Sequence, residues 1–338
     1  MTSDLRLGLT LGYWTAAPPD IVGLSQEAER LGFDSVWTAE AYGSDVFTPL
    51  AWVGAHTKRV KLGTGLVQLS ARTPAAVAMT AATLDHLAGG RLILGLGVSG
   101  PQVVEGWYGE PFAKPLARTR EYVEVVRRIL RRDEPVAFEG QHYPLPYRGE
   151  GSIGLGKPLK LTVHPLRTEV PIYLGAEGPK NVRLATEIGD GWLPIFYSPY
   201  RPEVYAESLA GAPEGFEIAC PVTVMVGDDV ASCLSIVKWY LAFYIGGMGA
   251  PGMNFHHDVI ARMGFDEEAR HVHDLFLSGD RAAAAEAVPD ALADEISLVG
   301  PAARIKERLQ AWLDSPVTQL LAGTQDPAAL AVLADCMG

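Results

Sequence analysis

The sequence has little cysteine and a deficit of positive charge. Its 338 residues include three cysteines, Cys220, Cys233 and Cys336, with no C-x-x-C pair, so we expect neither a disulfide framework nor a zinc site. Twenty-eight basic residues stand against 40 acidic ones, and the net charge of −12 argues against a nucleic-acid partner. No run of 18 apolar residues and no basic-then-apolar leader occurs. We therefore expect a cytoplasmic protein with no membrane partner.

Motifs for metals and nucleotide triphosphates are also missing. The histidine pairs His256-His257 and His271 with His273 have no accompanying H-E-x-x-H motif, so we predict no metal site. No Walker sequence occurs, which makes a nucleotide triphosphate ligand unexpected.

Short apolar segments alternate with amphipathic ones along most of the chain, which is typical of β-α units around a parallel sheet. Eight expected strands favour an α/β fold, a (β/α)8 TIM barrel, over an open sheet. We expect a single domain over 1–338, with a hairpin-type excursion at about 133–168 and a helical insertion at about 228–300. The expected strands are 5–11, 35–38, 60–65, 92–96, 172–174, 191–194, 218–226 and 318–322, and the expected helices are 20–32, 47–57, 74–87, 116–131, 230–245, 266–277 and 301–313.

Residues 172–192 combine an apolar strand, a break at Gly175, a turn through Gly178-Pro179 and an amphipathic helix. Free N–H groups and the positive dipole end of a helix's first turn favour a phosphate there. An ordinary strand-to-helix connection is the alternative. We predict a phosphate cradle, because residues 91–107 show a similar design.

That second segment carries Gly95, Gly97 and Gly100 after a buried strand. It is not a Rossmann fingerprint, because no acidic residue follows about 20 positions later to bind a ribose. We interpret it as a second small-residue turn beside the ligand.

In a TIM barrel the chemistry lies at the C-terminal ends of the strands. The predicted strand ends are rich in aromatic residues and glycine and poor in ionisable groups, which suits a flat ring cofactor better than hydrolysis. These ends include 12–14, 40–42, 65–68, 99–102, 175–180 and 196–197.

Several segments together carry a family resemblance that runs from about Leu5 to Leu321. The chain resembles the bacterial luciferase-like monooxygenase superfamily, and within it the oxidoreductases that use the deazaflavin coenzyme F420, the group containing methylenetetrahydromethanopterin reductase. The segments are Trp37-Thr38-Ala39-Glu40, Leu62 to Gly65, Arg72-Thr73-Pro74 with Thr83-Leu84-Asp85, Gly90-Arg91 to Gly97, and Gly175 to Trp192.

The resemblance implies coenzyme F420 as the cofactor and a set of residues around it. A non-prolyl cis peptide at Gly65-Leu66 would back the deazaflavin ring, although a simple barrel-lining turn is the alternative. Lys180 would lie at the cofactor phosphate, and the alternative is that it is an ordinary solvated lysine. The carboxylate of Glu177 is expected to turn toward solvent. The implied cofactor-binding residues are Glu40, Gly65, Leu66, Gln68, Ser99, Gly100, Ala176, Glu177, Gly178, Lys180 and Asn181.

Two positions separate this chain from the sugar-phosphate dehydrogenases of the family. Those enzymes have a histidine and a glutamate where this chain has Ala41 and Pro101. The resemblance therefore implies hydride transfer from the reduced deazaflavin to a C=C, C=N or C=O bond of a small-molecule substrate. Two alternatives stay open: an FMN-dependent monooxygenase of the same superfamily, and a barrel that has lost its cofactor and catalysis.

Glu40 is the candidate catalytic residue. A carboxylate at a strand end between Trp37 and Tyr42 is expected to be partly desolvated, which would raise its pKa and allow it to donate or relay a proton. The alternative is an acceptor that only positions the ring. Trp14, Tyr42 and Gln102 are the candidates for substrate contact.

The predicted helix over 230–245 carries the aromatic residues Trp239, Tyr240, Phe243 and Tyr244 on one face. We interpret this face as core or as a dimer contact in preference to a substrate site. A homodimer is the expected assembly.

Overall fold

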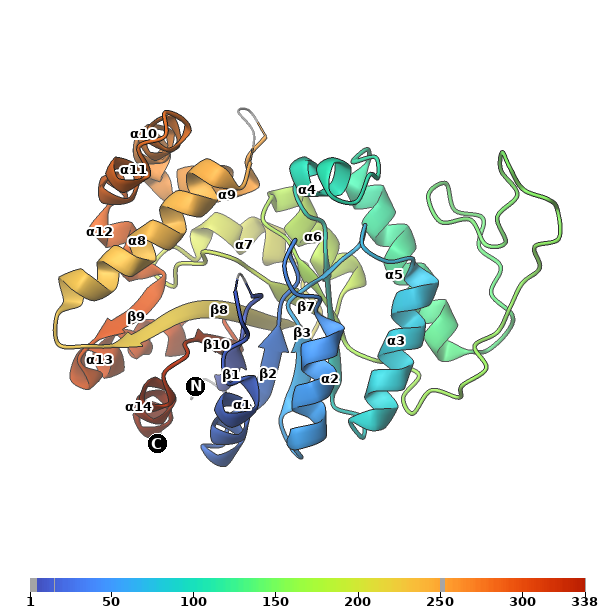
Figure 1. The fold of residues 1–338 in the computed structure, drawn as a ribbon, viewed down its shortest axis with the longest axis horizontal. Helices are drawn as coiled ribbons and strands as arrows, with labels where there is room; N and C mark the ends of the chain where they lie inside the picture. Colours follow the sequence, from blue (N-terminus) through green and yellow to red (C-terminus); the bar gives the residue numbers. More distant parts are fainter. Residues whose placement is uncertain (1–4, 15, 250–252, 338) are drawn as a thin grey trace.

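Parallel strands close into a barrel with helices around its outside (Figure 1). The computed structural model describes residues 5–14, 16–249 and 253–337. β10 pairs with β1 on one side and with β8 on the other, which closes the ring. The predicted (β/α)8 TIM barrel is confirmed. Its strands are β1 (Arg6–Thr10), β2 (Ser35–Thr38), β3 (Lys61–Thr64), β5 (Leu92–Gly97), β6 (Ile172–Gly175), β7 (Gly191–Leu193), β8 (Glu217–Val226) and β10 (Gln319–Gly323).

Helices follow most of the strands, and the barrel helices predicted from hydrophobic periodicity are present, whereas the helices over 203–209 and 327–337 (α7 and α14) were not predicted. The helix over 74–87 has the predicted bounds, because Thr73 accepts a hydrogen bond from the Ala76 N–H and Pro74 occupies the first turn. The barrel helices are α1 (Ile21–Arg30), α2 (Phe47–His56), α3 (Pro74–Leu87), α4 (Pro101–Gly106), α5 (Pro115–Arg131), α6 (Pro179–Ile188), α7 (Glu203–Leu209), α13 (Ala302–Leu313) and α14 (Pro327–Met337).

The inside of the barrel is filled by side chains and is not a pore. A separate buried cluster joins one inward residue from each of six strands: Trp37, Ile93, Tyr173, Leu193, Ala219 and Leu321. Gly63 makes room for the largest of these, since a Cβ there would overlap the Trp37 indole. A second, larger core lies between the strands and the surrounding helices.

Two short strands were not predicted. β4 (Val67–Gln68) continues the line of β3 after a bulge and pairs with β5. β9 (Ser297–Gly300) pairs with the last four residues of β8, outside the closed ring. β4, with two residues, is too short to show a period in the sequence.

The excursion at 133–168 is a long surface segment that projects away from the barrel (Figure 1). The hairpin-type pairing predicted there is present only in reduced form. The described residues form only two isolated antiparallel bridges, Val136 with Leu159 and Phe138 with Leu145. Proline and glycine interrupt the segment too often for a continuous ladder.

The helical insertion at about 228–300 has its own buried core. Its elements are α8 (Val230–Gly247), α9 (Phe255–Ile260), the π-helical turn η1 (Ala261–Phe265), α10 (Asp266–Leu277), α11 (Arg281–Ala287) and α12 (Asp290–Glu295). By length and apolarity, α8 is the one helix of the described residues that passes the test for a membrane span. That is weak support for a membrane, because α8 is the central helix of this core and core helices pass the same test.

Candidate active site

A cavity of about 1600 Å³ lies at the C-terminal ends of the strands, between the barrel and the insertion. The barrel rule predicts this position. Of the predicted site residues, only Trp14 is absent from the lining. The structure brings the others together around one space: Glu40, Tyr42, Gly65, Leu66, Gln68, Ser99, Gly100, Gln102, Ala176, Glu177, Gly178, Lys180 and Asn181. Their individual roles stay predictions.

A bulge between β3 and β4 projects Leu66 into the cavity. The peptide bond Gly65–Leu66 is cis, as the resemblance implied. The Leu66 side chain packs over two neighbouring strands that carry glycine where it crosses them. A Cβ at Gly97 or at Gly175 would overlap a terminal methyl of Leu66.

This packing corrects the interpretation of the glycines at 95 and 97. β5 extends through Gly97, so both residues belong to a strand and not to a turn. Gly95 is required because a Cβ there would overlap the carbonyl oxygen of Thr64 in the adjacent strand. The prediction of a turn that begins at Gly95 is therefore wrong for these two residues, whereas the predicted strand 92–96, which contains Gly95, is confirmed and extends one residue further. Ser99 and Gly100, beyond the strand, do line the cavity.

The predicted phosphate cradle is an open turn at the start of α6. Gly178 is the residue before the first helical turn, with φ −73° and ψ 146°, a conformation that any residue adopts. A Cβ at Gly178 would meet nothing within 4 Å. The turn leaves room for a ligand beside the positive end of the helix dipole. Lys180 is exposed, and its role stays a prediction.

Glu177 does not turn toward solvent as expected. Its side chain is 18% exposed, and its Oε2 lies 2.9 Å from Nδ1 of His256, which comes from α9. The backbone carbonyl of Glu177 accepts a hydrogen bond of 2.7 Å from Nη2 of Arg262. The insertion therefore covers this residue, which strand-by-strand reasoning about the barrel did not anticipate.

Glu40 is buried and fully engaged as an acceptor. Its Oε1 accepts from Nη1 of Arg72 at 2.6 Å, and its Oε2 accepts from the backbone N–H of Gln68 at 3.1 Å. Its own carbonyl accepts from the Gln68 side-chain amide at 2.8 Å. A carboxylate with donors on both oxygens is well placed to position groups. This arrangement supports the acceptor role over the proton-donor role.

Gln68 has one unused polar atom. Its Nε2 is committed to the carbonyl of Glu40, while Oε1 is buried and has no hydrogen-bond partner among the described residues. An unpaired buried acceptor costs free energy unless a partner arrives. Since Gln68 lines the cavity, a ligand N–H group fits this position.

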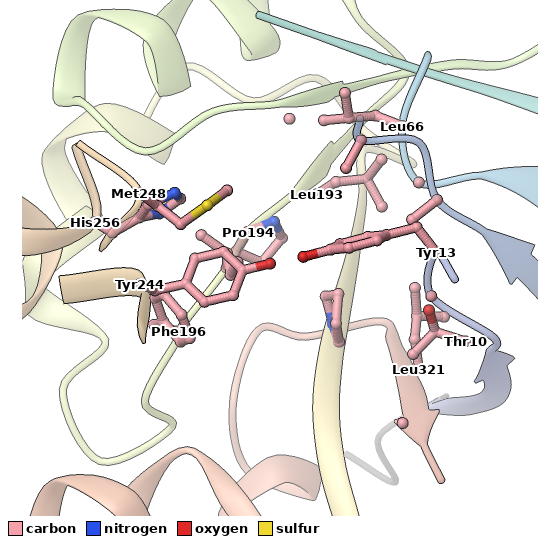
Figure 2. Close-up of a pocket in the computed structure, with 18 of the residues that line it drawn as sticks. Thr10, Tyr13, Leu66, Leu193, Pro194, Phe196, Tyr244, Met248, His256 and Leu321 are labelled. Carbon is pink, nitrogen blue, oxygen red and sulfur yellow. The ribbon is translucent and has the colours of Figure 1, made fainter. Parts of the chain in front are cut away.

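Tyr13, Tyr240 and Tyr244 line the cavity and were missed as site residues, and two of them face one another. Figure 2 shows Tyr13, which follows β1, and Tyr244, from α8, with their hydroxyl groups pointing toward one another. The sequence contained a signal for Tyr13, because it stands beside Trp14 at a predicted strand end. Tyr240 and Tyr244 belong to the aromatic face interpreted as core or dimer contact. Tyr244 is indeed part of the core of the insertion, and it also lines the cavity.

The structure offers no metal centre in the ranges it describes. No group of three or more His, Cys, Asp or Glu side chains within 5–14, 16–249 and 253–337 could hold a metal ion. The four histidines noted in the sequence do not converge with carboxylates into such a group.

A closed parallel barrel with one large cavity at the C-terminal strand ends defines the chain as a TIM-barrel enzyme. The model of the luciferase-like monooxygenase family matches residues 5–319, and the chain belongs to this family.

Named relatives lie close to the chain in sequence and in fold. A Mycobacterium tuberculosis protein named coenzyme F420-dependent oxidoreductase is 54% identical over 331 residues, covering 95% of each chain. The 5,10-methylenetetrahydromethanopterin reductase of Methanolobus tindarius is 31% identical over 307 residues, covering 88% of this chain and 87% of the relative. The structure of the coenzyme F420-dependent tetrahydromethanopterin reductase from Methanopyrus kandleri superimposes with a TM-score of 0.78 at 24% identity, covering 98% of this chain and 97% of that one.

Proposed function

We propose that the protein is a coenzyme F420-dependent oxidoreductase that transfers a hydride between the deazaflavin and a small organic substrate, in the direction that reduces a C=C, C=N or C=O bond. The relative at 54% identity bears the name of this enzyme class. An FMN-dependent monooxygenase and a non-catalytic barrel are the alternatives.

One observation carries the cofactor assignment. A single cavity joins an unpaired buried acceptor, Gln68 Oε1, to the open turn at Gly178. A ring with an N–H group and a tail with a phosphate would satisfy both positions at once. The residues present therefore fit a deazaflavin with a phosphate-bearing tail.

The deazaflavin, when bound, supplies the hydride. The protein's contribution is to bind, orient and exclude water. Leu66 offers an apolar support for the ring, and the ion pair of Arg72 with Glu40 fixes the backbone that presents Gln68. The absence of the family's acid–base pair at Ala41 and Pro101 favours reduction over sugar-phosphate oxidation.

Titration of the purified protein with each cofactor, followed by quenching of its seven tryptophans, tests this proposal. We expect micromolar or tighter binding of coenzyme F420 and much weaker binding of NADPH. Tight FMN binding with oxygen consumption and no deazaflavin binding would establish the monooxygenase instead. A protein that binds none of these cofactors would be the non-catalytic barrel.

The assembly and location remain our proposals: a single-domain chain that forms a homodimer in the cytoplasm and binds neither nucleic acid nor membrane. Trp52 on α2 and Met79 on α3 are each 57% exposed, so apolar surface is available on these barrel helices. Sedimentation velocity at micromolar concentration tests the dimer, and a monomeric mass would contradict it.

A further inference from the structure

Two tyrosine hydroxyls from distant parts of the chain meet inside the cavity. Tyr13 lies on the loop after β1, and Tyr244 lies on α8 of the insertion, 231 positions later in the chain. In Figure 2 the two rings approach from opposite sides, and their oxygens point into the space between them. Neither residue has a part in the binding of the ring or the phosphate described above.

The Tyr244 ring is held rigidly by other aromatic rings. It packs edge-on against Phe196 at 5.3 Å and against His256 at 4.8 Å between ring centroids, and it lies 4.7 Å from the Tyr240 ring. Tyr244 is only 7% exposed. A ring fixed on several sides cannot swing its hydroxyl away, so the donor is preorganised.

Tyr13 is directed into the cavity by the turn before it. Gly12 has φ +64°, a left-handed conformation that glycine adopts without cost. At this turn the chain leaves the direction of β1. Tyr13 then lines the cavity, whereas its neighbour Trp14 does not. The barrel and the insertion each contribute one hydroxyl to the same space.

Tyr244 stays protonated across the neutral pH range. Burial, followed by the nearby hydroxyls of Tyr240 and Tyr13, raises the pKa of Tyr244 well above its ordinary value of 10.0. A neutral phenol donates one hydrogen bond without adding a charge to the apolar site. It thus suits a group that is neutral in the ground state and becomes negative during reaction.

We propose that Tyr13 and Tyr244 together bind the carbonyl oxygen of the substrate, so that the substrate class is a ketone or an α,β-unsaturated ketone and not an imine. This inference rests on the proposed function. The carbonyl carbon, or the β carbon conjugated to it, accepts the hydride from the reduced deazaflavin, and the π electron pair moves to the oxygen. Tyr244 stabilises that oxygen by a hydrogen bond, and Tyr13 gives it a proton that water replaces.

A binding experiment without cofactor tests the pair directly. 4-Nitrophenolate carries an oxyanion on a flat apolar body, and its absorbance shifts when hydrogen bonds form. We expect Tyr244→Phe and Tyr13→Phe each to weaken its binding to the cofactor-free protein about tenfold. Tyr197→Phe is the control, because the Tyr197 hydroxyl is buried, has no hydrogen-bond partner among the described residues and does not line the cavity. Binding that survives both cavity changes would overturn the proposal.

Kinetics with the holoenzyme separate the substrate classes. The probes are cyclohex-2-enone and 2-methyl-1-pyrroline, a carbonyl and an imine of similar size. We expect Tyr244→Phe to lower kcat/KM for the enone about 100-fold, with little change in coenzyme F420 affinity and none in imine reduction. Equal losses on both probes, or no loss on the enone, would overturn the proposal.

The two experiments test the proposed function and the proposed substrate site independently. If the wild-type protein binds coenzyme F420 but turns over neither probe, the proposed reductase function fails. Nitrophenolate binding still decides whether the two hydroxyls form an oxyanion site, because that measurement involves no cofactor and no turnover.

Discussion

Two glycine-containing segments look alike in the sequence and differ in the structure. At the end of β6, Gly178 stands in open space at the start of a helix. At the end of β5, Gly95 and Gly97 are strand residues pressed against Thr64 and Leu66. The missing side chain at Gly178 leaves room for a ligand. The missing side chains at Gly95 and Gly97 leave room for neighbouring atoms of the protein. A glycine in a pattern thus has two distinct physical meanings, which substitutions can separate.

The largest effect is expected at Gly95. A Cβ there would overlap the backbone oxygen of Thr64 and lie 2.7 Å from Cδ1 of Leu193. Since a backbone oxygen in a barrel strand cannot move aside, Gly95→Ala should lower the free energy of unfolding by more than about 3 kcal/mol. Chemical denaturation measures this change, with Gly211→Ala, where a Cβ meets nothing within 4 Å, as the control. A wild-type unfolding curve for Gly95→Ala would contradict the packing described.

Gly97→Ala should cost less, because its Cβ meets a side-chain methyl of Leu66 and not backbone. We expect a loss of about 1–3 kcal/mol in the free energy of unfolding. The double change Gly97→Ala with Leu66→Ala removes the overlap, so the two effects should not add. Strict additivity in this double-mutant cycle would show that Leu66 is not the constraint.

Gly178→Val should affect the ligand and not the fold. The backbone conformation there suits valine, and the new methyl groups would enter open space. We therefore expect an unchanged unfolding curve and a fall in coenzyme F420 affinity of tenfold or more, about 1.4 kcal/mol. Fluorescence titration measures the affinity. Normal cofactor binding by Gly178→Val would remove this turn from the site.

Glu40→Gln should have the smallest effect, and it tests the role of the carboxylate. Glutamine still accepts a hydrogen bond but loses the charge that pairs with Arg72. We expect cofactor affinity and kcat/KM to decline together by about three- to tenfold, roughly 1 kcal/mol. Glu207→Gln is the matched control, since that carboxylate is 92% exposed. A 100-fold fall in turnover with unchanged affinity would restore the proton-donor role.

The sequence predicted the barrel well because its signals are local. Strand and helix periods, together with caps such as Thr73-Pro74, depend on neighbouring residues. The residue set around the cavity followed from the resemblance and from the rule that strand ends meet. The choice between Tyr13 and Trp14 did not follow, because the backbone turn at Gly12 decides which of two adjacent rings faces inward.

Contacts between the barrel and the insertion could not be predicted from the sequence. Glu177 and His256 lie within ion-pair distance of each other although they come from different elements. No pattern within either segment indicates this contact. The same holds for Arg72 and Glu40. Both lie in segments that carry the family resemblance, but they meet only because the end of β2 and the loop after β4 are side by side. A single sequence carries no information about such pairs beyond residue type.

The pairing of β9 with β8 bears on whether the insertion is a removable module. β8 is shared, because its middle pairs with β10 inside the ring and Thr223–Val226 pair with β9 outside it. A chain shortened by joining the end of β8 directly to α13 would leave those four residues as an open edge with free N–H and C=O groups. Exposed edges of this kind template the addition of foreign strands. In the structure β9 covers this edge of β8, and a shortened version would need charged or proline residues along the edge to prevent such pairing.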